Sequence, residues 1–422
     1  MSPPVLIELI DWLRQTFGDF PGANLLNFLS VRAGVAIIFS LTLSIITGGR
    51  IIRYLRRQQI GESVRDLGLE GQLEKKGTPT MGGIIILLAV LLPSLLFAKL
   101  NNVYLITMLV ATVWMGAIGF IDDYLKIKHK NKDGLAGKFK VAGQIGLGLL
   151  IAGIMLLSEQ VVVRMDVEQA AVDGIEDMQR IGAVRTVTLD SGATVDRADY
   201  RTTLTNVPFL KGSVLTYANL FGIGRQLVWV IFVPLIVFIV TAVSNAANLT
   251  DGLDGLATGT SAIIAGTLAV FAYVGSNAIA ANYLGILHLP GTEELVIFSG
   301  CLLGACLGFL WHNSFPASVF MGDTGSLALG GVIAALAILL RKELLIPILC
   351  GIFVIENLSV VAQVSYFKYT KKKYGEGRRI FRMSPLHHHY QKLGMSEIKI
   401  VTRFWIVGIL LAVATILTLK LR

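Results

Sequence analysis

Apolar runs long enough to cross a bilayer recur along the whole chain and alternate with shorter polar segments. A helix needs about 20 mostly apolar residues to cross roughly 30 Å of hydrocarbon. The pattern therefore predicts an all-α polytopic membrane protein with about ten transmembrane helices. The predicted spans are 25–48, 82–98, 103–121, 140–158, 226–246, 256–274, 293–311, 324–340, 344–366 and 402–421.

The first 20 residues predict a short helix at the membrane surface. Their apolar residues recur at roughly helical spacing in an otherwise polar stretch: Val5, Leu6, Leu9, Ile10 and Leu13. The stretch carries acids where a leader would be basic, and it has no small-residue cleavage site. No cleavable signal peptide is therefore predicted.

One long polar segment, residues 159–225, interrupts the series of spans. Apolar and polar residues alternate in it on both sides of Asp190, Ser191 and Gly192, which predicts a small β-hairpin. We interpret the chain as a single integral membrane domain, residues 1–422, with 159–225 as a periplasmic insertion on its outer face.

Lysine and arginine in the loops predict the orientation of the spans. Loop 49–81 holds seven of them, loop 122–139 five and loop 367–401 nine. These three loops lie on one side of a ten-span topology, and an excess of basic residues marks the cytoplasmic side. Both termini are then expected on the outer side.

The composition agrees with a membrane protein, since 54% of residues are hydrophobic, only 15% are charged and the mean hydropathy is +0.68. Soluble proteins are about 25% charged. The net charge of +9 does not indicate nucleic-acid binding, because the basic residues lie in loops between spans. Cys301, Cys306 and Cys350 lie in apolar runs and form no disulfide or zinc spacing.

Five polar, glycine-rich segments share the predicted cytoplasmic face. They are residues 74–83, 122–123, 244–259, 311–331 and 382–394. Ionisable residues at a membrane boundary are costly, so their presence there indicates function. The span assignment did not use these segments, which makes their convergence on one face independent evidence for a site.

The acidic residues of these segments suit a magnesium site. Mg²⁺ prefers oxygen ligands and usually bridges a carboxylate to a substrate phosphate. Asp122 and Asp123 are adjacent, and Asp251, Asp254 and Asp323 lie in glycine-rich turns. Two interpretations of the turn with Asp251 and Asp254 stay open. An aspartate caps the following helix, or the glycines let backbone N–H groups approach a phosphate closely.

The remaining polar groups fit anionic ligands. His387, His388 and His389 are consecutive, and three neighbours on a helix cannot all face one tetrahedral ion, so zinc is disfavoured. We expect them near phosphates, with a solvated loop as the alternative. Lys75, close to Thr80 and two glycines, either contacts a phosphate or only reflects the basic cytoplasmic side.

Five motifs in order, "KKGTPTMGG", "GFIDDYLK", "NLTDGLDGLA", "FMGDTGSLALGG" and "PLHHHY", resemble those of the phospho-N-acetylmuramoyl-pentapeptide transferases, the translocase I family of lipid I synthesis. This family belongs to the polyprenyl-phosphate N-acetylhexosamine-1-phosphate transferases. The resemblance covers all ten spans. It departs at 159–225, where the family usually has a shorter loop, and at "HHHYQ", where "HHHFE" is more usual.

The resemblance implies a Mg²⁺-dependent transferase of peptidoglycan synthesis in the bacterial inner membrane. Undecaprenyl phosphate attacks the sugar-bearing phosphate of UDP-MurNAc-pentapeptide, which yields lipid I and UMP. The site is expected at the cytoplasmic face, where a lipid phosphate and a soluble nucleotide meet. Direct attack, with Asp122 accepting a proton or orienting the lipid phosphate, and a two-step route through a covalent aspartate both stay open. The resemblance is also compatible with a homodimer.

The motif match assigns residues to roles. The implied catalytic residues are Asp122, Asp123, Asp323, His387, His388 and His389, with Asp323 as a metal ligand and Asp122 and Asp123 as further candidate ligands. The expected substrate contacts are Lys75, Thr80, Lys126, Lys138, Asn245, Asn248, Asp251, Gly252, Leu253, Asp254, Asn313 and Phe320. Of these, the lysines are expected to offset the diphosphate charge, and Phe320 to stack on uracil.

Two other functions fit parts of the pattern. A related transferase that uses UDP-GlcNAc would share the acidic motifs, and "MSPLHHHYQKLG" favours the muramoyl-pentapeptide substrate over it. A secondary transporter would place its polar residues near the midplane, often in inverted repeats. The polar motifs here share one face, which disfavours transport.

Overall fold

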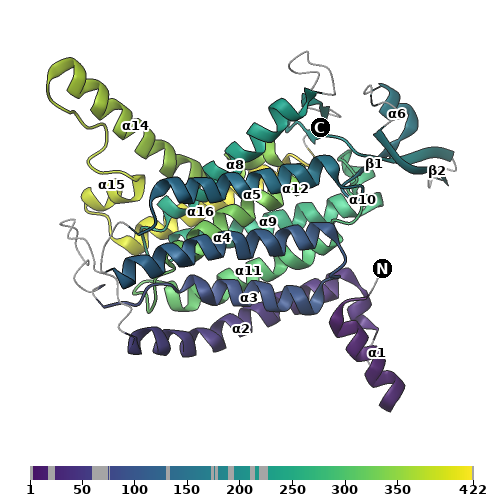
Figure 1. Ribbon diagram of the computed structural model, residues 1–422, viewed down its shortest axis with the longest axis horizontal. Helices are drawn as coiled ribbons and strands as arrows, with labels where there is room; N and C mark the ends of the chain where they lie inside the picture. Colours follow the sequence, from purple (N-terminus) through teal and green to yellow (C-terminus); the bar gives the residue numbers. More distant parts are fainter. Residues whose placement is uncertain are drawn as a thin grey trace.

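The computed structural model describes residues 3–17, 24–58, 75, 77–129, 134–172, 175, 179–188, 194–209, 214–217 and 227–420. Long helices lie side by side along the longest axis of the molecule (Figure 1). Eight helices in the described ranges are long and apolar enough to cross a membrane. They are α2 (Leu29–Arg57), α4 (Val103–Lys128), α5 (Gly137–Leu157), α8 (Trp229–Thr250), α9 (Leu256–Ser276), α11 (Glu293–Asn313), α12 (Gly322–Leu339) and α16 (Glu397–Leu417).

The other two predicted spans differ from simple transmembrane helices. Span 82–98 is α3 (Gly83–Phe97), an apolar helix of 15 residues, about 22 Å long at 1.5 Å per residue. Span 344–366 is broken, because η4 (Glu343–Leu345) with α13 (Ile346–Leu349) and α14 (Gly351–Tyr374) meet at a bend of 78°. The polytopic all-α prediction is confirmed, and by length and composition the described helices make eight spans, or nine with the bent pair.

The third predicted span ends too early. The apolar run stops at Ile121, but α4 continues to Lys128, so Asp122 and Asp123 lie within the helix and not after it. The boundary was wrong because hydropathy follows the polarity of side chains, whereas a helix continues as long as its polar groups find partners. Both aspartates do find them, as described below.

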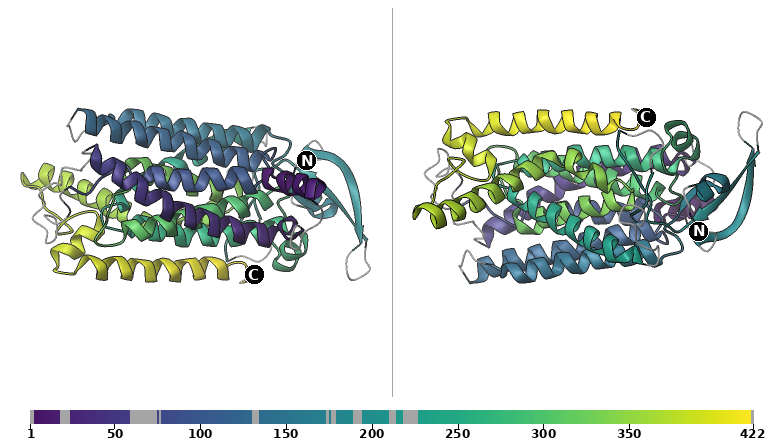
Figure 2. Two further views of the ribbon diagram at one scale, coloured as in Figure 1. Left: turned by 90° about the horizontal axis from the view of Figure 1, so that it is seen from below. Right: turned by 90° about the horizontal axis from the view of Figure 1, so that it is seen from above.

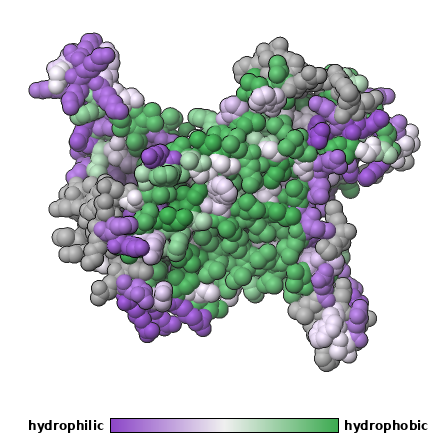
Figure 3. All heavy atoms as spheres, in the orientation of Figure 1, coloured by the Kyte–Doolittle hydropathy of each residue, from purple (hydrophilic) through white to green (hydrophobic). Residues whose placement is uncertain are grey.

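The bundle is tightest around α12, of which 89% of the membrane-spanning window is buried. Small residues let its neighbours approach. A Cβ atom on Gly83 of α3 would meet the backbone of Gly325, and one on Gly119 of α4 would meet the carbonyl of Asp323. The first turn of α12 is therefore held against α3 and α4 by backbone contact. Apolar side chains cover the flank of the bundle between two polar ends (Figure 3).

One end of the bundle carries the predicted insertion. Strands β1 (Val163–Asp166), β3 (Thr194–Tyr200) and β2 (Arg180–Thr188) form an antiparallel sheet in that order. The predicted hairpin corresponds to β2 and β3, and its turn at 190–192 lies outside the described residues. The insertion also contains α6 (Val167–Val172) and the pair β4 (Thr205–Asn206) and β5 (Val214–Leu215), so it is larger than a hairpin.

The same end carries α1 (Val5–Phe17), which confirms the predicted N-terminal helix, together with η1 (Leu25–Asn27) and α10 (Ala278–Leu284). Both chain termini lie there as well (Figure 2). The opposite end carries α15 (Leu386–Lys392), the ends of α4 and α8 and the start of α12. The polar segments singled out in the sequence therefore meet at the end of the bundle away from the sheet.

Candidate active site

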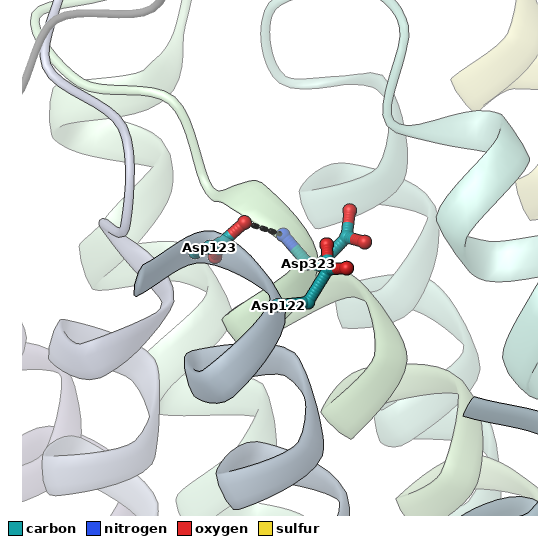
Figure 4. A group of neighbouring side chains, drawn as sticks. All are labelled: Asp122, Asp123 and Asp323. Carbon is teal, nitrogen blue, oxygen red and sulfur yellow. Dashed lines mark hydrogen bonds between the residues drawn. The ribbon is translucent and has the colours of Figure 1, made fainter. Parts of the chain in front are cut away.

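Three carboxylates meet where α4 ends and α12 begins. Asp122 and Asp123 come from the last turns of α4 and Asp323 from the first turn of α12 (Figure 4). One oxygen from each lies within 4.8 Å of the others. We call these three residues the acidic cluster. Carboxylates this close repel one another, so their charge must be offset by neighbouring groups.

Asp123 binds the start of α12. Its carboxylate accepts hydrogen bonds from the backbone N–H of Asp323 at 3.1 Å and of Thr324 at 2.8 Å, and from the Thr324 hydroxyl at 2.6 Å. These donors are among the N–H groups that a helix start leaves unpaired, and a negative charge is favourable there. Gly322 has a φ of +71°, and a Cβ atom on it would collide with Asp123, so this position suits only glycine.

Asp122 faces two lysines. Lys140 Nζ lies 2.8 Å from its Oδ1, which also accepts the backbone N–H of Leu135 at 2.7 Å. Lys126 Nζ lies 2.6 Å from its Oδ2, in an ion pair whose angles do not meet those of a hydrogen bond. Asp122 is fully buried, so Oδ2 is a buried oxygen without an aligned donor among the described residues.

The same lysines reach Asp323. Lys140 Nζ lies 2.6 Å and Lys126 Nζ 3.2 Å from its Oδ2. Asn248, near the end of α8, donates to the other oxygen of Asp323 at 2.9 Å and to the Ser326 hydroxyl at 2.8 Å. Residues of α4, α5 and α8 thus hold the Asp323 carboxylate of α12 in place. In total, the three acids of the cluster face two lysines.

The acidic cluster fits a hard divalent cation. It offers oxygen atoms from three carboxylates, and among the described residues the buried Oδ2 of Asp122 has an ammonium ion pair but no aligned hydrogen-bond donor. Mg²⁺ typically takes one or two protein carboxylates and completes its shell with water and substrate phosphates. Asp122, Asp123 and Asp323 are therefore the residues that would hold it.

A second group of charges surrounds Lys75. Its Nζ lies 2.7 Å from Asp254 Oδ1 and 2.6 Å from Glu397 Oε1. Glu397 also accepts the backbone N–H of Asp254 at 2.7 Å, and Asp254 Oδ2 accepts the N–H of Ala317 at 3.0 Å. We call Lys75, Asp254 and Glu397 the lysine site. It joins the segments around residues 75, 254 and 317 to the start of α16.

The three histidines lie on α15 and face different partners. His387 Nδ1 lies 3.1 Å from Glu356, His388 Nδ1 lies 2.7 Å from Gln391 Oε1, and His389 Nδ1 accepts the backbone N–H of Arg382 at 3.1 Å. The imidazoles do not converge on one point, as expected from their spacing. Burial and the neighbouring His387 lower the pKa of His388 to about 4, so its imidazole is neutral at physiological pH.

Of two further predicted residues, Thr80 borders the acidic cluster, and Phe320 joins the segment of Thr80 to the segment before α12. A Cβ atom on Gly322 would lie 3.0 Å from the Thr80 hydroxyl, so Thr80 is beside Asp123. The Phe320 N–H donates to the carbonyl of Pro79, and its carbonyl accepts the N–H of Gly82, both at 2.8 Å. These bonds bring the segment of Lys75 against the segment of Asp323.

Other predicted residues serve the scaffold. Asn245 donates to Gln144 of α5 at 2.9 Å and to a carbonyl of its own helix. Asn313 is buried; its oxygen accepts from the Gly255 N–H and the Thr258 hydroxyl, and its amide donates to Val319. Leu253 packs in an apolar cluster with Leu256, Ile352 and Ile400. Asp251 follows the last residue of α8. Gly252 contacts His387.

The structure places the two predicted lysines differently, because Lys126 contacts the acidic cluster and Lys138 does not within the described residues. The ammonium of Lys138 is exposed and lies 5.3 Å from the ring of Phe139, and no ion pair of Lys138 with the acidic cluster is found among the described residues. Lys140, two positions later, makes these contacts instead. Sequence reasoning passed over Lys140 because it was read as the polar start of a span.

Two acids were also missed. Glu397 begins α16 and Glu356 lies inside α14, where it is fully buried. Glu356 was detectable, because an acid within an apolar run is costly and indicates function. Glu397 had no such signal, since an acid in the first turn of a helix is common.

Comparisons with known proteins bear on this site. A family model described as glycosyl transferase family 4 matches residues 200–341, and phospho-N-acetylmuramoyl-pentapeptide-transferase signature 1 matches residues 75–87. Three similar proteins bear the name phospho-N-acetylmuramoyl-pentapeptide-transferase. That of Flavobacterium psychrophilum is 54% identical over 422 residues, with 99% of this chain and 100% of the relative covered. That of Parabacteroides distasonis is 53% identical over 436 residues, with the same coverage. That of Amoebophilus asiaticus is 52% identical over 408 residues, covering 96% and 97%.

Proposed function

This chain belongs to the phospho-N-acetylmuramoyl-pentapeptide transferase family, and we propose that the acidic cluster is its magnesium-dependent catalytic centre. The enzyme transfers phospho-MurNAc-pentapeptide from UDP-MurNAc-pentapeptide to undecaprenyl phosphate. The products are lipid I, a precursor of peptidoglycan, and UMP. The long insertion at 159–225 lies within the span aligned to the Flavobacterium psychrophilum relative, so it belongs to this branch of the family and does not argue against membership.

The observation that carries the proposal is the gathering of three acids and two lysines at one point. Residues far apart in the chain, on α4, α5 and α12, place their charged groups within ion-pair distance. Phosphoryl transfer needs reactants in line and their negative charge offset more than it needs covalent chemistry. The acidic cluster and its lysines supply both kinds of group.

Magnesium bound by the acidic cluster would neutralise the diphosphate and polarise the bond that breaks. Lys126 and Lys140 hold the cluster together in the structure and are placed to bind phosphate oxygens when the substrate enters. In direct attack, an oxygen of the lipid phosphate forms a bond to the sugar-bearing phosphorus. The bond from that phosphorus to the bridging oxygen breaks, and UMP leaves with both electrons.

Asp122 orients the lipid phosphate in this proposal. Its position between Lys126 and Lys140 supports that role over a covalent one, because a carboxylate held by two ammonium groups is a weaker nucleophile. The two routes differ in an exchange reaction. A covalent intermediate would let labelled UMP enter UDP-MurNAc-pentapeptide without the lipid, whereas direct attack would not.

The lysine site is proposed to receive the nucleotide. Lys75 adjoins the glycine-containing turn 251–254, where backbone N–H groups can approach a phosphate closely. Phe320 is half-buried and hydrogen-bonded to the backbone of Pro79 and Gly82, in the segment that follows Lys75, and its ring is proposed to stack on uracil. Lys75 is ion-paired with Asp254 and Glu397 in the structure, so binding of a phosphate would exchange one anionic partner for another.

We place the site at the cytoplasmic face of the inner membrane. The described parts of the basic loops, the lysine site and the acidic cluster share one end of the bundle, and lysine and arginine mark the cytoplasmic side. Labelling of Lys372→Cys and Thr186→Cys in intact cells tests this. Both positions are exposed at opposite ends, and the three native cysteines are buried. An impermeant maleimide should label only residue 186, and labelling only of residue 372 would reverse the orientation.

Detergent-solubilised protein tests the reaction and the metal. Incubation with undecaprenyl phosphate and UDP-MurNAc-pentapeptide should release UMP, lose that activity in EDTA and regain it on addition of Mg²⁺. UMP release with UDP-GlcNAc instead would favour the related transferase. Activity that persists in EDTA would remove magnesium from the proposal.

A further inference from the structure

Glu356 is a buried carboxylate that the proposed reaction does not yet use. It lies near the start of α14, just after the bend at Cys350, and its side chain is fully buried. A charge within an apolar helix is costly and persists where it has a partner. Its partner is His387. Glu356 accepts the backbone N–H of His387 at 3.2 Å and lies 3.1 Å from its Nδ1.

The other nitrogen of His387 faces the turn that contains Gly252. A Cβ atom on Gly252 would collide with Nε2, so only glycine lets the ring come this close to the backbone. Nε2 is buried and has no hydrogen-bond partner among the described residues. A buried polar atom without a partner is unfavourable, and among the described residues none fills this place, which leaves it open to a ligand.

The carboxylate decides what Nε2 can do. With Glu356 at Nδ1, the imidazole keeps its hydrogen on Nδ1. The same carboxylate holds the ring through Nδ1 and the backbone of His387 through its N–H. Nε2 then accepts a hydrogen bond when the ring is neutral and donates one when the ring carries a second hydrogen. In the donating state, Nε2 suits a phosphate oxygen beside the lysine site.

Two other polar side chains of α14 show that binding the following segment to this helix does not require a charged residue. Gln363 and Thr370 follow Glu356 at intervals of seven residues, nearly two helical turns, so all three lie on one face. Gln363 accepts the backbone N–H groups of Ile380 and Phe381, and Thr370 accepts that of Arg378. Neutral side chains therefore suffice to bind this segment to α14. Of these three residues, Glu356 is the acid, and it is the one that contacts an imidazole.

We propose that Glu356 is a positioning residue, which holds His387 so that Nε2 meets a phosphate of the nucleotide substrate at the turn 251–254. This inference rests on the proposed function. Because α14 begins at the bend, the break in the helix sets the direction from which Glu356 reaches His387. The bent helix is thereby coupled to the nucleotide site through one carboxylate and one imidazole.

A double-mutant cycle tests the coupling. Glu356→Gln keeps the volume and removes the charge, and it should lower kcat/KM for UDP-MurNAc-pentapeptide by about 10- to 100-fold. If Glu356 acts through His387, the double variant with His387→Ala should be no slower than His387→Ala alone. Gln363→Met is the matched control, since it removes a neighbouring anchor on the same face. Its effect should multiply with that of His387→Ala.

Two outcomes overturn the inference: wild-type kcat/KM for Glu356→Gln, or multiplicative losses for Glu356→Gln and His387→Ala. If Glu356→Gln lowers the melting temperature in detergent so far that the assay fails, Glu356→Asp replaces it in the cycle. That variant keeps the charge and withdraws the carboxylate by one methylene, and the same two outcomes apply.

Binding of UDP, measured by calorimetry, separates this inference from the proposed function. Glu356→Gln, His387→Ala and the double variant should weaken UDP binding by the same factor. Unequal, multiplying losses would again overturn the inference. If the wild-type protein binds UDP but makes no lipid-linked product, the proposed function is overturned. The UDP affinities of the single and double variants then still test the role of Glu356.

Discussion

Asp123 accepts the backbone N–H of Asp323 at 3.1 Å, so one acid of the cluster binds the start of the helix that carries another. The neighbouring Asp122 instead faces Lys126 and Lys140. Two adjacent residues of one helix therefore have different surroundings. Asp123 organises the backbone of α12, and Asp122 is directed to the charged groups of the site.

This difference predicts different effects on stability. Asp123→Ala should destabilise the protein by about 0.5–2 kcal/mol, the usual cost of losing a helix cap, because it leaves the N–H of Thr324 buried without an acceptor. Asp122→Ala removes the acceptor of one backbone N–H, that of Leu135, where Asp123→Ala removes the acceptor of two, and its lost lysine pairs are offset by relief of repulsion within the cluster. Melting temperatures in detergent should fall further for Asp123→Ala, and the reverse order would contradict the assignment.

Asp323→Asn should abolish turnover. It keeps the shape of the side chain and removes the charge that two lysines and the proposed metal share. A loss of at least about 100-fold is expected from the removal of one preorganised electrostatic group. Any residual UMP release should depend less on added Mg²⁺. Near-wild-type release would exclude Asp323 as a metal ligand.

Lys140→Gln should lower turnover by about 100-fold or more, because Lys140 contacts both Asp122 and Asp323. Lys138→Gln is the control on the same turn of α5. Its ammonium is exposed near Phe139, so a change of less than about twofold is expected at a site that carries only a surface charge. Measured kcat/KM values for the two variants decide which lysine serves the site. Equal losses would contradict the structure.

Gly119→Ala should impair both stability and turnover. The added methyl group would collide with the carbonyl of Asp323, which is backbone and cannot rotate away. Overpacking of this kind costs about 1–3 kcal/mol, and a shift of about 1 Å in Asp323 is enough to slow the reaction about 100-fold. Gly34→Ala on α2 has open space around it and should leave both properties intact. Melting curves and UMP release check the pair.

His388 should make the fold sensitive to acid. Its folded pKa of about 4 is lower than the ordinary value of 6.5, so between these values the unfolded chain binds a proton that the folded chain does not. Stability therefore falls as the pH drops from about 6.5 towards 4. His388→Gln should reduce this fall. Melting temperatures across that range test it, and parallel curves for wild type and variant would exclude the contribution.

The sequence predicted the membrane character of the chain and the end at which its polar segments meet. It did so because a bilayer demands continuous apolar runs and leaves costly charges visible between them. The limits of single elements were less predictable. The continuation of α4 to Lys128 depends on partners that Asp122 and Asp123 find elsewhere in the chain, and the bend between α13 and α14 interrupts a run that hydropathy shows as continuous.

Only the tertiary structure determines which polar residues contact one another. The sequence marked Asp122, Asp123 and Asp323 through their setting, and by itself it determined ten apolar helical segments and one polar end. It did not distinguish Lys140 from Lys138, since both are lysines at the start of one helix and only the rotation of α5 against α4 and α12 selects one. It gave equally little sign that Glu356 meets His387, because that contact depends on the bend before α14 and on the fold of the segment that follows. Hydropathy is a local property of the chain, whereas an ion pair requires two distant segments to be packed in one register.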